Sequence, residues 1–152
     1  MNSARTQYSE PGTLNPISFG TFRAVAVLVG ARTYRELHCW QLATQLKRRL
    51  YEIIAMPPAK SDFRFCDQIR DSARGGPRAI AEGFGRFRPT EFARYLEFAR
   101  ASLMETQSLI DDALDSGYVT QSVHDELTSL ANRAIGATTN LHRYLRSKSK
   151  SR

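Results

Sequence analysis

AIAEGFGRFRPTEF, from Ala79 to Phe92, is the stretch of sequence that decides between two kinds of fold. Its two glycines, Gly83 and Gly85, resemble those of a phosphate-binding loop, but the third glycine of a dinucleotide fingerprint and the lysine of a P-loop are missing. Two such glycines also fit the left-handed geometry that ends a helix, and Pro89 fits the first position of the next helix. The sequence therefore predicts a turn between two helices, with Glu82 as its hydrogen-bonding anchor.

The strongest helical pattern follows this turn, in residues 89–116. Apolar side chains recur there every three or four positions, as they do on the buried face of an amphipathic helix. Gly117 is the expected stop, and Glu91 lies in the first turn, where the helix dipole favours a negative charge. The residues expected to face inward are Phe92, Tyr95, Leu96, Ala99, Leu103, Thr106, Ile110, Ala113 and Leu114.

A second helical segment precedes the turn, over residues 61–83. Ser61 or Asp62 is its expected N-cap, because both side chains accept hydrogen bonds from free backbone N–H groups. Pro77 lies inside the segment, where a proline should kink the helix or break its hydrogen-bond ladder. The glycines beside the proline weaken the helix further, so we expect a neighbouring helix to approach closely over Gly76.

Two more segments, residues 33–56 and 120–147, have the same period. Thr33 and Glu36 predict a capping box at the start of the first segment, and Thr120 predicts an N-cap for the second. Four amphipathic helices joined by short connections predict an all-α fold. The expected architecture is an antiparallel up-down-up-down four-helix bundle.

The sequence predicts three regions in the chain. Residues 1–32 are rich in Ser, Gly, Pro and Asn and show no period, so they predict a flexible leader that is poorly ordered or partly docked through its apolar run. The bundle is expected to occupy residues 33–147. Residues 148–152 end a basic, serine-rich stretch and are expected to form a disordered tail.

The composition is that of one basic globular domain. The chain has 152 residues, 41% hydrophobic and 24% charged, with a formal net charge of +7 and a pI near 9.8. Cys39 and Cys66 are isolated and are expected to be small core residues in a reducing compartment. No stretch approaches the roughly 18 apolar residues of a membrane span, so we expect a cytoplasmic protein with no membrane partner.

The positive charge points to phosphate polymers as partners, because a basic surface attracts them. Residues 1–60 contain eight Lys or Arg against three Asp or Glu, whereas residues 101–152 contain six of each, so the excess lies in the first half. Asp67 and Asp71 share a helix face with some of these arginines and could pair with them. The candidate nucleic-acid-binding residues are Lys47, Arg48, Arg70, Arg74, Arg78, Arg86 and Arg88.

The segments YRELHCWQLATQLKRRLYEI (34–53), QIRDSARGGPRAIAEGFGR (68–86), EFARYLEFARASLMET (91–106) and GYVT (117–120) resemble a known family. It is the four-helix bundle family related to proteins encoded within intervening sequences of bacterial large-subunit rRNA genes. The accessory variability determinant of diversity-generating retroelements is similar. The resemblance covers about residues 34–145 and implies a ring-like homopentamer. In the retroelement relative, a basic pentamer is thought to engage nucleic acid and a reverse transcriptase, and the resemblance implies no catalytic activity.

The sequence favours one of three classes of function. The one favoured is a non-enzymatic oligomer that binds nucleic acid, RNA rather than DNA, through the phosphate backbone without base-specific readout. The alternative is a protein-interaction scaffold or an accessory subunit of a nucleic-acid enzyme such as a reverse transcriptase. An enzyme is disfavoured because His38, His124 and His142 form no Glu-x-x-His pair, and no catalytic residue, metal ligand or cofactor site is predicted.

An oligomer is also expected from the aromatic residues, which exceed what one bundle would bury, because apolar residues on the flanks of helices usually mark an interface. They are Trp40, Phe63, Phe65, Phe84, Phe87, Phe98 and Tyr118.

Overall fold

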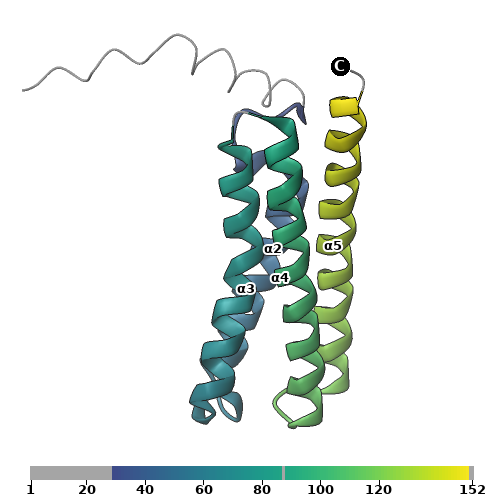
Figure 1. Cartoon of the computed structure of the whole chain (residues 1–152). Coiled ribbons are helices and arrows are strands. Elements are labelled where there is room, and N and C mark those ends of the chain that lie inside the picture. Colours follow the sequence, from purple (N-terminus) through teal and green to yellow (C-terminus); the bar gives the residue numbers. More distant parts are fainter. Residues whose placement is uncertain (1–28, 87, 151–152) are drawn as a thin grey trace, which may run out of the picture.

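The structure is a computed structural model that describes residues 29–86 and 88–150. Over these residues the chain is helical, with no strand, as predicted (Figure 1). The elements in order are the 3-10 turn η1 (Tyr34–Glu36), α2 (His38–Ile54), the 3-10 turn η2 (Ala59–Ser61), α3 (Phe63–Phe84), α4 (Pro89–Asp115) and α5 (Gln121–Lys150).

The four α-helices lie side by side, and α4 packs against both α3 and α5, while α2 covers the opposite side of the same core (Figure 1). Three side-chain pairs join α4 to α5, and their order along one helix is the reverse of their order along the other. They are Glu97 with His142, Gln107 with Asn132, and Asp111 with His124.

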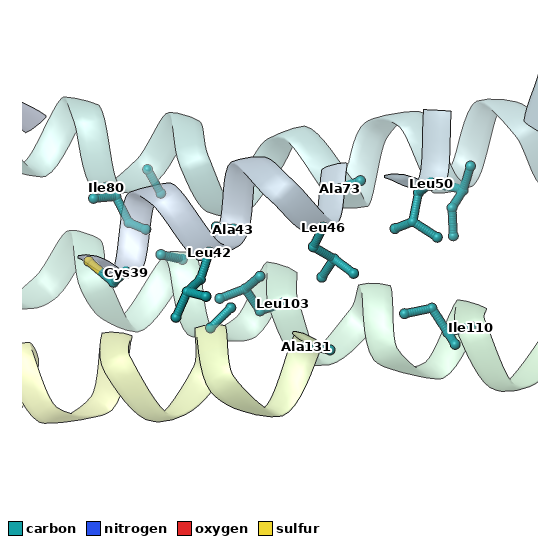
Figure 2. Packing of buried hydrophobic residues seen from close by; sticks show 14 of the residues in the cluster. Cys39, Leu42, Ala43, Leu46, Leu50, Ala73, Ile80, Leu103, Ile110 and Ala131 are labelled. Carbon is teal, nitrogen blue, oxygen red and sulfur yellow. The ribbon is translucent and has the colours of Figure 1, made fainter. Parts of the chain in front are cut away.

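The core fills the space between these helices (Figure 2). From α2, Leu42 and Leu46 point into it, toward Leu103 of α4. Seven of the nine α4 residues expected to face inward are buried, and Tyr95 and Leu114 are partly buried. The amphipathic period therefore located the buried face of α4.

The predicted close approach at Gly76 is confirmed. A Cβ atom added there would lie 3.2 Å from the side chain of Leu103, and one added at Gly75 would lie 2.6 Å from Oγ of Ser102. Because these α4 side chains lie so close, a larger residue at either position would force them to move, so the glycines that weaken α3 locally also allow it to pack on α4. Pro77 does not end the helix, because α3 continues through it to Phe84.

Three of the expected helix signals are confirmed. The Asp62 carboxylate accepts a hydrogen bond from the backbone N–H of Phe65 at 3.0 Å and so caps α3. The Thr120 hydroxyl oxygen accepts one at 3.3 Å from the first turn of α5. Gly117 has φ of +74°, a left-handed geometry that follows the end of α4.

The expected capping box at Thr33 and Glu36 is wrong. Leu37 stands at the N-cap of α2 without a side-chain hydrogen bond, because its backbone is extended and its side chain is buried. The η1 turn ends there, and α2 begins one residue later. The Glu36 carboxylate accepts a hydrogen bond from the backbone N–H of Arg32 at 3.0 Å instead.

The left-handed geometry expected at Gly83 and Gly85 is also wrong. Gly83 lies inside α3, and Gly85 has φ of −73°. Gly83 serves close packing instead, because an added Cβ atom would lie 2.6 Å from Cβ of Tyr95 and 2.7 Å from the Phe92 ring. The turn that follows is closed by backbone hydrogen bonds, one of them from the Arg86 N–H to the Gly83 carbonyl at 3.0 Å.

The ends of the chain differ from expectation in part. Helix α5 extends through Lys150, so the disorder expected for residues 148–152 is wrong over 148–150, while 151–152 lie outside the described residues. The extension is supported by burial of Leu145 and by the Ser149 hydroxyl, which donates to carbonyls of the same helix. Most of the leader, residues 1–28, lies outside the described residues as well, but its end at Ala31 is buried in the core.

Candidate nucleic-acid interface

The structure spreads the seven predicted binding residues along the bundle rather than gathering them. Lys47 and Arg48 lie on α2, three arginines lie on the outer face of α3, and Arg86 and Arg88 flank the α3–α4 turn. All are exposed except Lys47, which is half-buried. They therefore do not form one site, and their neighbours decide which of them present free charge.

Two of the α3 arginines are neutralised by aspartates one turn earlier, as the sequence allowed. Arg70 pairs with Asp67 at 3.3 Å, and Arg74 pairs with Asp71. Both pairs are exposed, so they add little stability, but each cancels a charge locally. Arg78 has no such partner among the described residues.

The turn between α3 and α4 presents two cations in different ways. Arg86 donates a hydrogen bond to the Tyr95 hydroxyl, and its guanidinium lies 4.5 Å from the centroid of the Tyr95 ring. Arg88 stands at the N-cap of α4, as expected, and makes no capping hydrogen bond. Glu82 is exposed, its carboxylate has no hydrogen bond to another described residue, and Phe87 of the same turn lies outside the described residues, so its role as the anchor of this turn stays a prediction.

The largest group of cations lies where the sequence did not predict it, on α5 from Arg133 onward. Residues 133–150 hold five exposed cations, and between positions 127 and 150 there is no Asp or Glu. The signal was present in the sequence, but the last part of this stretch was expected to be a disordered tail. The five residues are Arg133, Arg143, Arg146, Lys148 and Lys150.

Folding brings this segment to the same end of the molecule as the α3–α4 turn (Figure 1). The contact between Gly75 and Ser102 and the hydrogen bond from Gln107 to Asn132 mark the level at which the bundle divides into two halves. We call residues 29–46, 75–104 and 133–150 the basic half, and residues 47–74 and 105–132 the acidic half.

The two halves differ strongly in charge. The basic half has twelve Lys or Arg against four Asp or Glu, a net of +8, and the acidic half has seven against ten, a net of −3. Positive charge is therefore concentrated at one end of the bundle and a smaller negative charge at the other. The structure places Arg78, Arg86 and Arg88 in the basic half and the other four predicted residues in the acidic half.

The described residues contain no group of three or more His, Cys, Asp or Glu side chains that could hold a metal ion. Cys39 and Cys66 are buried free thiols, as expected, and burial raises the pKa of Cys39 to about 11 and raises that of Cys66. A buried protonated thiol is a poor nucleophile. No helix in the described ranges is long and apolar enough to cross a membrane.

Comparison with models of protein families finds a match. The family model described as 23S rRNA-intervening sequence protein matches residues 35–140, which include α2, α3, α4 and most of α5. A search of curated proteins finds no match. Because the family model covers more than half of the chain, the protein belongs to the family of 23S rRNA-intervening sequence proteins.

Proposed function

We propose that this protein is a non-enzymatic nucleic-acid-binding oligomer that holds RNA, in preference to DNA, by its phosphate backbone. The observation that supports the proposal is the separation of charge along the bundle, with a net of +8 in the basic half. Cations that neutralise phosphates release condensed counter-ions, which gives strong binding that weakens as salt rises. Membership in a family named for an intervening sequence of 23S rRNA agrees with RNA as the polymer.

The binding is of backbone and shape rather than of base sequence. Several aromatic rings near the cations are already in contact with them, with Arg86 over Tyr95 at 4.5 Å and Lys148 over Tyr144 at 5.6 Å. Arginine and lysine side chains that contact phosphates position the polymer but do not read its base sequence. RNA of unrelated sequence should therefore bind with similar affinity.

The subunit is proposed to be an antiparallel up-down-up-down bundle that assembles into a homo-oligomer, a pentameric ring by the resemblance. The reversed order of the α4–α5 pairs supports the antiparallel arrangement. Phe63 and Phe98, exposed by 78% and 49%, support assembly, because large apolar side chains on a surface commonly mark an interface. Phe65 and Phe84 are buried within the subunit, and Phe87 lies outside the described residues. Assembly brings several basic halves together, so their electrostatic fields add. Light scattering measures the number of subunits.

The test compares two charge-matched variants. Arg78→Gln/Arg88→Gln removes two cations from the basic half, and Lys47→Gln/Arg48→Gln removes two from the acidic half. Affinity for a single-stranded RNA and a DNA duplex is measured by fluorescence anisotropy at about 50 and about 200 mM salt. The wild type should bind RNA more tightly, lose affinity steeply with salt, and be weakened mainly by the first variant. No binding at the lower salt would refute the proposal.

A protein-interaction scaffold, or an accessory subunit of a nucleic-acid enzyme such as a reverse transcriptase, is the second candidate. It is favoured by the exposed rings of Phe63 and Phe98 and by the net negative charge of the acidic half, which suits a basic protein. A scaffold or accessory function predicts a complex with a partner protein that remains bound at high salt and forms without RNA. Co-purification of a partner that withstands salt, together with no RNA affinity, would select it over the first.

A further inference from the structure

Two hollows adjoin along the C-terminal half of α5, the first between α4 and α5 and the second lined by α5 alone. One, of about 300 Å³, is lined by Leu96, Glu97, Arg100, Thr138, Thr139 and His142. The other, of about 370 Å³, is lined by His142, Arg143, Arg146, Ser147 and Lys150. Because His142 lines both, the two hollows are neighbours, and we call them together the α4–α5 groove.

The α4–α5 groove is lined by four cations and one carboxylate. Arg100, Arg143, Arg146 and Lys150 are exposed and have no ionic partner among the described residues. Glu97 is the acidic residue of the lining, and its carboxylate is hydrogen-bonded to Nε2 of His142 at 2.9 Å. The groove therefore has unpaired positive charge, in contrast to the paired arginines of α3.

The hydrogen-bond donors left available in the groove are charged groups of the kind that bind phosphate. The Thr139 hydroxyl donates to the Ile135 carbonyl at 2.8 Å, and the Ser147 hydroxyl donates to the Tyr144 carbonyl at 2.7 Å, so both are engaged with their own helix. The guanidinium and ammonium groups are left, and these are the side chains that pair with phosphate oxygens. The groove thus suits a polyanion better than a neutral ligand.

The spacing of the cations suits a strand rather than a single ion. From Thr139, level with Arg100, to Lys150 the helix rises about 16 Å, at about 1.5 Å per residue. One nucleic-acid strand places a phosphate about every 3.4 Å along a duplex axis, so this length spans about four or five phosphates. A row of cations of this length can follow a backbone.

We propose that the α4–α5 groove is where the backbone of single-stranded RNA lies, with Arg100, Arg143, Arg146 and Lys150 pairing with its phosphates and Glu97 limiting the affinity. The proposal rests on the proposed function and adds the surface to it. The sequence-predicted pair Arg70 and Arg74 contributes little, because a phosphate there must compete with Asp67 and Asp71.

Two charge-matched double variants test the location. Arg143→Gln/Arg146→Gln removes two groove cations, and Arg70→Gln/Arg74→Gln removes two paired cations from α3. The groove variant should bind single-stranded RNA about tenfold or more weakly at about 50 mM salt and lower the slope of log affinity against log salt by about 1.4. The α3 variant should change affinity by less than about threefold. Circular dichroism checks that both remain helical.

A gain of binding tests the groove in the direction that loss of structure would not produce. Glu97→Gln removes its carboxylate, and Glu105→Gln makes the same change two turns along α4, in the acidic half. Glu97→Gln should tighten RNA binding severalfold, while Glu105→Gln should have a smaller effect because it lies farther from the bound phosphates. Equal effects of the two substitutions would contradict the proposal.

These experiments distinguish a wrong location for the RNA-binding surface from a wrong proposed function. Equal losses of RNA affinity in both double variants, or a larger loss in the α3 variant, would contradict the groove as the binding surface but not RNA binding itself. No RNA binding by the wild type would overturn both. Polyglutamate that competes with RNA at equal charge concentration would show that the groove accepts any polyanion and would overturn the assignment to a phosphodiester.

Discussion

Gly83 and Gly136 are both inside helices, but their surroundings are opposite. An alanine Cβ atom at Gly83 would lie 2.6 Å from Cβ of Tyr95 and 2.7 Å from the ring of Phe92, which is fully buried. At Gly136, on the exposed side of α5, the added atom would meet nothing within 4 Å. The same substitution should therefore stabilise the protein at one position and destabilise it at the other.

The magnitudes follow from two effects. Alanine is favoured over glycine inside a helix by about 1 kcal/mol, so Gly136→Ala should raise the free energy of unfolding by about that amount. At Gly83 the same gain is opposed by overpacking, which costs about 1–3 kcal/mol. The cost should be near the upper end, because Cβ of Tyr95 moves only with the backbone of α4. Gly83→Ala should then lose about 1–2 kcal/mol.

Urea unfolding of the wild type and both variants at one protein concentration measures the difference. A thermal melt should show shifts in opposite directions, of about 2–4 °C per kcal/mol for a chain of this size. Gly83→Ala with a stability equal to or above that of the wild type would refute the close packing of α3 on α4. A loss of stability in Gly136→Ala would refute the open surface assigned to that part of α5.

Three further predictions concern titratable groups and a cap. The hydrogen bond to Asp111 raises the pKa of His124, so its contribution to stability is complete below the ordinary histidine pKa and is lost as pH rises through the raised value. Between about pH 6 and about pH 8 the wild type should therefore lose more stability than His124→Gln, measured by urea midpoints. Burial and a pKa of about 11 should keep the Cys39 thiol, and with it Cys66, unreactive toward a thiol reagent at neutral pH until the protein unfolds. Asp62→Ala should lower the melting temperature more than Asp62→Asn, because asparagine still caps α3.

Periodicity predicted most of the fold because each helix buries one continuous stripe. The caps at Asp62 and Thr120 and the stop at Gly117 depend on single residues and their immediate neighbours, so the local sequence was enough to predict them. The errors came from tertiary contacts. Burial of Leu37 outweighs the local capping signal, and Gly83 is small because α4 lies against it, not because the chain turns there.

The candidate site was harder to predict, because its charge is organised by folding rather than by sequence. Residues 101–152 contain six cations and six anions and read as neutral along the chain. All six anions precede position 127, and the five cations that the structure describes follow position 132, so folding sends these two groups to opposite ends of the bundle (Figure 1). The unpaired cations of α5 were missed for this reason, whereas the pairing of Arg70 and Arg74 followed from helical spacing alone.

Photo-crosslinking of the full chain to single-stranded RNA containing 4-thiouridine, followed by mass spectrometry of the linked peptides, tests the central claim most directly. Linked peptides should come from residues 75–104 and 133–150 of the basic half, and the links should disappear as salt rises. Links concentrated in residues 47–74 and 105–132, or links that persist at high salt, would contradict a backbone interface on the basic half.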